Sequence, residues 1–309
     1  PLYSSAASDV YKRQMKEFST QDVLIGRISR TYLIDNYLIV TDYNSPDKLI
    51  HLFDKNTFEH LASSTYQGQG PDEITIIGHV GIDETNRRFF VSDHGKLKIF
   101  AYDLDSVLTT PEYQPSVKID MKKKLFPDDY LYLNDTLCIA KIIEPIGNND
   151  YKPSVARWNM ATGEINPMPY EYPDLKKVRF IYTASAEHQL YVQCYTQYDL
   201  MTICDFNGNL KCNIYGPKWV NEKTQTQHYS LGVEFCGDKI LALYSGGDHR
   251  TDAYYPTKFL VFDLNGNYLK TLETGYMITD FCYDKENNRL IINLNDEIQF
   301  AYLDLEGII

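Results

Sequence analysis

The sequence has no excess of basic residues, no long apolar run and few cysteines. Its 309 residues carry 30 Lys and Arg against 42 Asp and Glu, a net charge of −12. This balance argues against a basic face for nucleic acid or for an anionic membrane surface. No apolar run approaches the ~18 residues of a transmembrane helix. The six cysteines form no C-x-x-C pair, so we expect free thiols buried in strands.

Motifs of known chemistry are also missing. The sequence has no G-x-S-x-G elbow, no H-E-x-x-H, no phosphate-binding glycine loop and no EF-hand spacing. The seven histidines are scattered, without a ligand pair at short spacing. The sequence therefore predicts no cofactor, no metal site and no identifiable catalytic residue.

A period of about fifty residues dominates what is present. Six short apolar runs end at residues 40, 91, 139, 192, 242 and 292, at intervals of 48 to 53 residues. Aromatic residues make up 14% of the chain, and these favour strands. No long segment has the 3.6-residue apolar period of a helix, which excludes helical solenoids.

A second element recurs in phase with the first. An apolar run ends in Asp or Asn before a turn, and the copies are Phe53-Asp54, Tyr102-Asp103, Trp158-Asn159, Cys204-Asp205, Phe262-Asp263 and Leu303-Asp304. Asn207-Gly208, Asn265-Gly266 and Glu306-Gly307 supply residues that accept positive φ in tight turns. Each period therefore reads as strand, turn, strand, loop, strand, tight turn and strand.

Four antiparallel strands in ~40–50 residues form one blade of a β-propeller. We expect an all-β fold, a single six-bladed β-propeller over residues 18–309. The fourth strand of the last blade is cut short after Gly307, and the segment Gln21–Gly26 has no partner of its own. We expect this N-terminal segment to complete the last blade, because an uncovered edge would promote aggregation. The alternative is an open ring truncated at both ends.

The first residues have a different character. Pro1–Gln14 has no apolar period and resembles the translated adapter sequence found at the edges of metagenomic gene predictions. We expect a disordered, non-native leader over residues 1–14. On that interpretation the natural N-terminus, with any export signal or lipid-attachment cysteine, is missing.

The aromatic-Asp-x-x-Gly turn, as in Phe262-Asp263-Leu264-Asn265-Gly266, and the stretch Gln67–Glu73 resemble the TolB-like (NHL-like) six-bladed β-propellers. Asp72 stands where that family usually has a second glycine. The resemblance implies a cell-envelope location, in the periplasm or attached to the outer membrane, often as a lipoprotein. It implies no catalytic residues.

Taken by itself, the stretch Gly68–Glu73 reads as a connection between blades. Pro71 pushes Gly70 toward extended backbone, and Gly68 and Gly70 allow a sharp turn. Glu73 would then accept backbone N–H bonds. The alternative, direct ligand contact, is less favoured because the glycine pattern of a dinucleotide site is incomplete.

Candidate ligand contacts come from loop lengths. Two connections between second and third strands are long, 141–153 and 244–258, and long loops on a rigid scaffold concentrate binding residues. The candidates in the second are Asp248, His249, Arg250, Asp252, Tyr254 and Tyr255. Asp93-His94 occupies the corresponding place in blade two, where inward-pointing side chains would bind a metal or orient a water. Ordinary solvated loops and surface hydrogen bonds are the alternative for both.

These features favour a non-catalytic binding module for a protein, peptide or glycan, without nucleic acid as a partner. The alternative is a hydrolase or lyase that acts on a sugar or lactone with residues from several blades. An enzyme would show carboxylates, with or without His, converging on one point. A binder would show a broad aromatic face.

Overall fold

The computed structural model describes residues 9–11, 14–20, 23–121, 125–147, 150–173 and 175–309. It is all-β, with six sheets that each contain four antiparallel strands, the blades of a six-bladed β-propeller. One of the sheets has a fifth strand, which pairs in parallel. Two short helical elements, α1 (Leu104–Thr109) and η2 (Asp252–Tyr254), lie between strands. In the part of the chain described, no helix is long and apolar enough to cross a membrane.

The strands follow the predicted period. The first two blades contain β3 (Ser29–Ile34), β4 (Tyr37–Asp42), β5 (Lys48–Asp54), β6 (His60–Tyr66), β7 (Ile77–Asp83), β8 (Arg88–Asp93), β9 (Lys98–Asp103) and β10 (Ser116–Asp120). The next two contain β11 (Phe126–Asn134), β12 (Leu137–Gly147), β13 (Asp150–Asn159), β14 (Glu164–Pro167), β15 (Phe180–Ser185), β16 (Leu190–Tyr195), β17 (Leu200–Asp205) and β18 (Leu210–Tyr215). The last two contain β19 (Thr226–Cys236), β20 (Lys239–Asp248), β21 (Lys258–Asp263), β22 (Tyr268–Glu273), β23 (Ile278–Asp284), β24 (Arg289–Leu294) and β25 (Phe300–Asp304).

The recurring Asp or Asn stabilises the turn after the third strand of a blade. The Asp205 carboxylate accepts the backbone N–H groups of Asn207 and Asn209 at 2.8 and 2.9 Å. Asp263 accepts those of the equivalent residues in blade five. Gly208 and Gly266 have φ of +80° and +82°, the left-handed backbone predicted for these turns.

The chain divides into two compact units, residues 18–145 with 155–166, and residues 1–17, 146–154 and 167–309. In each unit the core lies between successive sheets, where both faces of a strand are covered. Tyr102 and Phe89 stack 4.9 Å apart in the first unit, and Phe259 meets Phe281 at 4.9 Å in the second. The six cysteines are free thiols, as expected.

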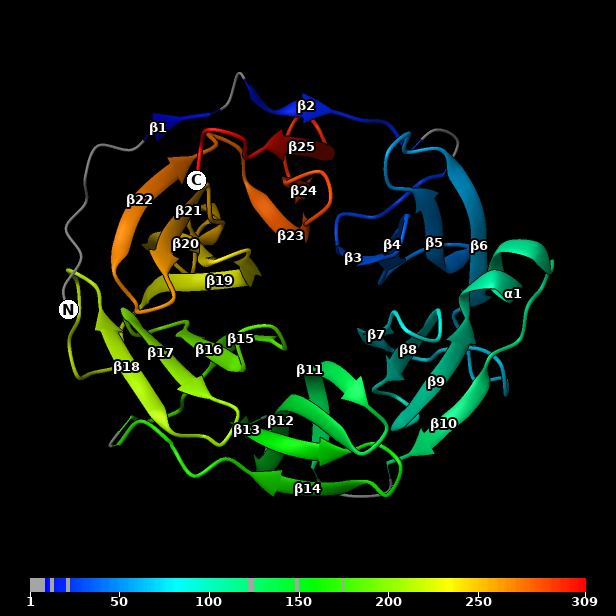
Figure 1. Ribbon diagram of the computed structural model, residues 1–309, viewed down its shortest axis with the longest axis horizontal. Helices are drawn as coiled ribbons and strands as arrows, with labels where there is room; N and C mark the ends of the chain where they lie inside the picture. Colours follow the sequence, from blue (N-terminus) through cyan, green and yellow to red (C-terminus); the bar gives the residue numbers. More distant parts are fainter. Residues whose placement is uncertain (1–8, 12–13, 21–22, 122–124, 148–149, 174) are drawn as a thin grey trace. The chain divides into compact units, whose positions relative to one another are not determined.

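Strands from the beginning of the chain complete the last two blades. β2 (Lys16–Glu17) pairs antiparallel with β25, and β1 (Asp9–Val10) pairs parallel with β22 (Figure 1). Closure of the last blade by an N-terminal strand is thus confirmed, but the segment predicted for it is wrong. Val23–Gly26 forms no strand, because Gly26 instead donates its N–H to buried Asp42 of blade one at 2.7 Å. Residues 21 and 22 lie outside the described residues.

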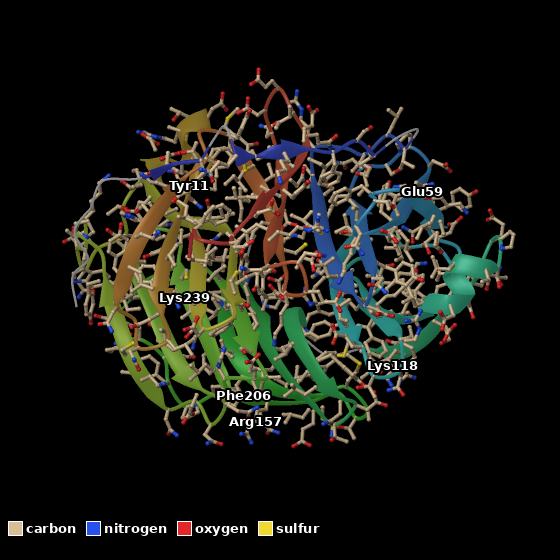
Figure 2. The ribbon with its side chains drawn as sticks, turned by 45° about the horizontal axis from the view of Figure 1, so that its top comes forward. Tyr11, Glu59, Lys118, Arg157, Phe206 and Lys239 are labelled. Atoms are coloured by element: carbon tan, nitrogen blue, oxygen red, sulfur yellow. The ribbon has the colours of Figure 1, made fainter. Side chains whose placement is uncertain are left out.

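The expected leader also has described contacts. Tyr11 donates its N–H to the carbonyl of Glu273 at 2.8 Å and is 7% exposed, packed beside β22 (Figure 2). The origin of Pro1–Gln14 as a leader stays a prediction.

Candidate ligand-binding face of the C-terminal unit

A long hairpin forms one border of the candidate site. The sequence predicted a loop at 141–153, but β12 and β13 extend through most of it. Near its tip, the ring of Tyr151 lies 4.9 Å from the guanidinium carbon of Arg179, which precedes β15. Lys152 forms an ion pair with Glu171 at 2.9 Å. The hairpin tip is therefore fastened to the connection between blades three and four.

Three half-buried aromatic residues, Tyr172, Tyr215 and Trp219, form a cluster that we call the aromatic shelf. Their ring centroids lie 5.0 to 6.4 Å apart, and their planes cross at 58° to 76°. The hydroxyls of Tyr172 and Tyr215 are 3.2 Å apart. The sequence pattern does not single out these residues, because Tyr172 lies more than forty residues before Tyr215 at the end of β18 and Trp219 in the following connection.

A buried acid–base pair lies beneath the connection that carries Trp219. Asp199 and His228 are each 1% exposed, with 3.7 Å between Oδ1 and Nδ1. Burial lowers the pKa of His228, and this outweighs the opposite effect of Asp199, so the imidazole is neutral at neutral pH. The Lys218 N–H donates to Asp199 at 3.0 Å. The pair therefore positions the residue next to Trp219.

The pair also contacts the predicted binding loop. Nδ1 of His228 lies 3.2 Å from the hydroxyl of Tyr244, on β20. A Cβ on Gly216 would lie 2.1 Å from the carboxylate of Asp199. Glycine at this position therefore lets the backbone approach the buried acid.

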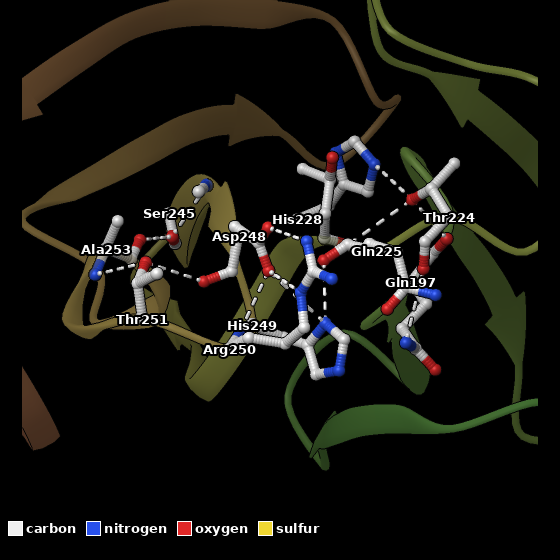
Figure 3. A network of polar contacts seen from close by, with 12 residues as sticks. Gln197, Thr224, Gln225, His228, Ser245, Asp248, His249, Arg250, Thr251 and Ala253 are labelled. Atoms are coloured by element: carbon white, nitrogen blue, oxygen red, sulfur yellow. Dashed lines mark hydrogen bonds and ion pairs between the residues drawn. The ribbon is translucent and has the colours of Figure 1, made fainter.

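The loop over 244–258 holds a network of polar contacts (Figure 3). Asp248 accepts two hydrogen bonds from the Arg250 guanidinium at 3.0 and 2.6 Å, which holds the pKa of that carboxyl well below its usual range. His249 bonds through its backbone N–H and through Nδ1 to the carbonyl of Gln225, at 3.1 and 2.9 Å. Lys218 reaches the carbonyl of Gly246 at 3.4 Å. The contacts of Lys152 with Glu171 and of Lys218 with Gly246 thus connect hairpin, shelf and loop, and we call the three together the candidate face.

The remaining loop candidates lie at its outer end. Asp252 is exposed in the short helix η2. Tyr254 and Tyr255 stack with 4.2 Å between centroids, and burial together with Tyr255 raises the pKa of Tyr254 to about 12. The ligand roles of all six loop candidates stay predictions.

Asp93 and His94 lie in the other compact unit. The buried Asp93 carboxylate accepts the backbone N–H groups of Thr75, Ile76, Gly95 and Lys96 at 2.9 to 3.2 Å. It therefore ties the connection before β7 to the turn after β8. The ring of His94 packs on Phe126, with its pKa lowered by burial.

Glu73 fills the turn formed by Gly68–Glu73. Its carboxylate accepts the Gly70 N–H at 2.7 Å, and a Cβ on Gly68 would lie 1.9 Å from it. Lys96 donates to the carbonyls of Gly70 and Glu73. A cavity of about 220 Å³ opens beside this turn, lined by Pro71 and others.

One histidine–carboxylate pair was missed by the sequence reasoning. His79 on β7 contacts Asp129 on β11, with 2.9 Å between Nδ1 and Oδ1. Burial opposes ionisation of Asp129, but the charges of His79, Lys141 and Arg30 outweigh it and keep the pKa of Asp129 below its usual range. Nε2 of His79 donates to the carbonyl of Tyr130 at 2.8 Å. Both ring nitrogens therefore already bond to protein groups.

No group of three or more His, Cys, Asp or Glu side chains suited to a metal occurs among the residues that the structure describes.

Comparisons with known proteins agree on the fold. Residues 18–135 match the model of the DUF5128 family, described as a 6-bladed beta-propeller. A crystal structure of a DUF4221 family member from Bacteroides vulgatus has a TM-score of 0.59 at 12% identity, covering 94% of this chain and 95% of that one. No curated protein matches.

The extracellular domain of the BT4673 one-component system from B. thetaiotaomicron has a TM-score of 0.53 at 11% identity. The match covers 88% of this chain and 33% of the other. At these identities the likeness shows the β-propeller fold alone. The narrower TolB-like assignment is not confirmed by it.

Proposed function

We propose that this chain is a non-catalytic recognition module that binds a protein, peptide or glycan on the face formed by hairpin, aromatic shelf and loop. The observation that carries the proposal is the aromatic shelf itself. Tyr172, Tyr215 and Trp219 offer large, rigid contact surfaces with polar groups at their edges, the composition typical of binding hot spots.

The proposal includes a place in the cell envelope. It is supported by the extracellular domain among the structural neighbours and by the TolB-like sequence features, of which the Phe262–Gly266 turn is the clearest.

The second candidate, a hydrolase or lyase, rests on the pair His79–Asp129. A general base needs a free nitrogen within reach of the substrate. His79 uses Nδ1 for Asp129 and Nε2 for Tyr130, and His228 is 1% exposed. Their present bonds therefore favour a positioning role for both histidines, and binding is the better supported function.

Tryptophan fluorescence provides the test. Trp158 is fully buried, whereas Trp219 is half-buried on the shelf, so a ligand on this face should change the emission of Trp219. We would titrate panels of peptides, envelope proteins and oligosaccharides into the wild type, Trp219→Phe and Trp158→Phe. A ligand should change emission in the wild type and in Trp158→Phe, and not in Trp219→Phe.

A response that persists in Trp219→Phe, or binding unaffected by Trp219→Ala, would place the ligand elsewhere and contradict the proposal. Release of product from an oligosaccharide or lactone, abolished by His79→Ala, would establish the enzyme instead.

A further inference from the structure

The candidate face differs in charge from the rest of the chain. The described residues of the segments 146–154, 167–179, 215–225 and 244–258 carry eight Lys and Arg against five Asp and Glu, although the whole chain has a net charge of −12. An acidic protein with a locally basic face favours an anionic ligand there, because association is steered by the local field.

Two acidic side chains of this face are paired with two of its basic side chains. Glu171 pairs with Lys152, and Asp248 with Arg250. Arg179 and Lys218 have no carboxylate of a described residue within 4.0 Å. Arg179 is instead held over the ring of Tyr151, with its planar donors available for a bidentate bond to a carboxylate.

The shelf adds a preference for flat, hydroxyl-bearing groups. Its rings cross at 58° to 76°, so they meet edge to face or tilted, and no two of them stack in parallel. The C–H face of a sugar ring fits such an aromatic face, while its hydroxyls bond to neighbouring polar groups. On the shelf, the hydroxyls of Tyr172 and Tyr215, which lie 3.2 Å apart, are such polar groups.

We propose that the face binds an acidic oligosaccharide, whose carboxylates contact Arg179 and Lys218 while a sugar ring packs on Trp219. This inference rests on the proposed function and narrows it to one ligand class. An acidic peptide would satisfy the two cations, but it lacks the rigid ring with one apolar face that the shelf favours.

Isothermal titration calorimetry of the full chain tests the charge. The probes are oligogalacturonate, alginate and chondroitin oligosaccharides, with methyl-esterified oligogalacturonate as an uncharged match and a glutamate-rich peptide of equal charge. We expect Arg179→Gln and Lys218→Gln each to weaken binding of the best acidic oligosaccharide about tenfold to a hundredfold, the usual range for a charged hydrogen bond. Arg157→Gln, an exposed arginine in the other unit, is the matched control and should change nothing.

The outcomes separate the two proposals. Equal affinity for the ester, or no response to Arg179→Gln and Lys218→Gln, would overturn the acidic-ligand inference while leaving recognition at the shelf intact. Tighter binding of the glutamate-rich peptide would replace the glycan by a peptide. Absence of binding by every acidic oligosaccharide would also overturn the inference. The proposed function itself is contradicted only if no peptide, protein or oligosaccharide changes the fluorescence of Trp219.

Discussion

The guanidinium carbon of Arg179 lies 4.9 Å from the ring centroid of Tyr151, although the two residues belong to different blades. This contact fastens the tip of the long β12–β13 hairpin to the start of blade four. A stacked arginine is held in one orientation at little further entropic cost when it binds an anion. Tyr151 thus holds Arg179 in place before a ligand binds, and both residues belong to the candidate face.

Removal of that ring should loosen the arginine without altering the charge of the face. We expect Tyr151→Leu to lower the affinity for a charged ligand by a factor of about 2 to 5, since an exposed cation–π contact contributes about 0.5–1 kcal/mol. Tyr151→Phe keeps an aromatic face and should retain affinity. Calorimetric titration of both variants makes the comparison, and equal losses would exclude the cation–π explanation.

The buried pair beneath the shelf leads to a prediction about Gly216. A Cβ there would lie 2.1 Å from the Asp199 carboxylate, so Gly216→Ala must displace either the backbone or a buried charge. We expect a loss of about 2–4 kcal/mol in the free energy of unfolding, the range for disruption of buried polar networks. Urea denaturation measures it.

Gly237→Ala is the matched control for that experiment. Gly237 has a φ of +59° and no atom within 4 Å of an added Cβ. Its substitution has only the backbone cost of about 1 kcal/mol. If the two variants lose the same stability, steric contact with Asp199 is not the cause.

Glu73 and Gly68 should be coupled. Because a Cβ added to Gly68 would overlap the Glu73 carboxylate, Gly68→Ala should destabilise the protein by about 1–3 kcal/mol, as overpacking does. In a Glu73→Ala background that clash is absent, and Gly68→Ala should then be neutral or stabilise by up to about 1 kcal/mol, because Gly68 is not among the positive-φ residues and alanine lowers the entropy of the unfolded chain. A double-mutant cycle from urea midpoints tests this, and additive losses would show that the turn does not close around Glu73.

The repeat could be predicted because it is local. The run Tyr37–Val40 and its five counterparts fall in the second strands of the six blades, and the turn glycines Gly208 and Gly266 adopt the positive φ that their sequence requires. Both features follow from short-range pattern and turn chemistry. The fold class could therefore be predicted from the sequence.

The candidate site could be predicted less well from the sequence, for a physical reason. Tyr172 and Trp219 meet only because two connections between blades lie side by side, and no sequence spacing encodes that contact. The same applies to His79 and Asp129. The strand that closes the last blade was also misplaced. Apolar Val23-Leu24-Ile25 reads as a better strand than Lys16–Glu17, but the Asp42 contact of Gly26 directs that segment to blade one.

His51 makes stability depend on pH. It is 4% exposed, Nδ1 lies 2.8 Å from the Ser63 hydroxyl, and Nε2 is buried without a hydrogen-bond partner. Burial, aided by His60, lowers the pKa of His51 from 6.5 to about 4. Between pH 6.5 and 4 the unfolded chain therefore binds more protons than the folded one at this residue, so stability falls as the pH falls through this window.

The shift corresponds to about 3 kcal/mol, at 1.36 kcal/mol per pKa unit. We expect His51→Gln to remove most of that pH dependence and to reduce stability at pH 7. His249→Gln, an exposed histidine, should leave the dependence unchanged. Urea denaturation of the three proteins at pH 7 and pH 4.5 gives one difference in stability for each, and an equal difference in wild type and His51→Gln would refute a neutral buried imidazole.

The N-terminal segment provides the last prediction, because its interpretation as a leader and its contacts lead to opposite expectations. Tyr11 packs among Leu272, Leu303 and other buried residues of the last two blades. Tyr11→Ala should therefore reduce the free energy of unfolding by about 3–5 kcal/mol, as for other buried aromatic residues. Lys16→Ala breaks an ion pair with Asp304 between two half-exposed side chains and should leave the stability almost unchanged, because exposed ion pairs contribute little. A disordered leader predicts no effect of Tyr11→Ala, so chemical denaturation of these two variants distinguishes a docked segment from a passive one.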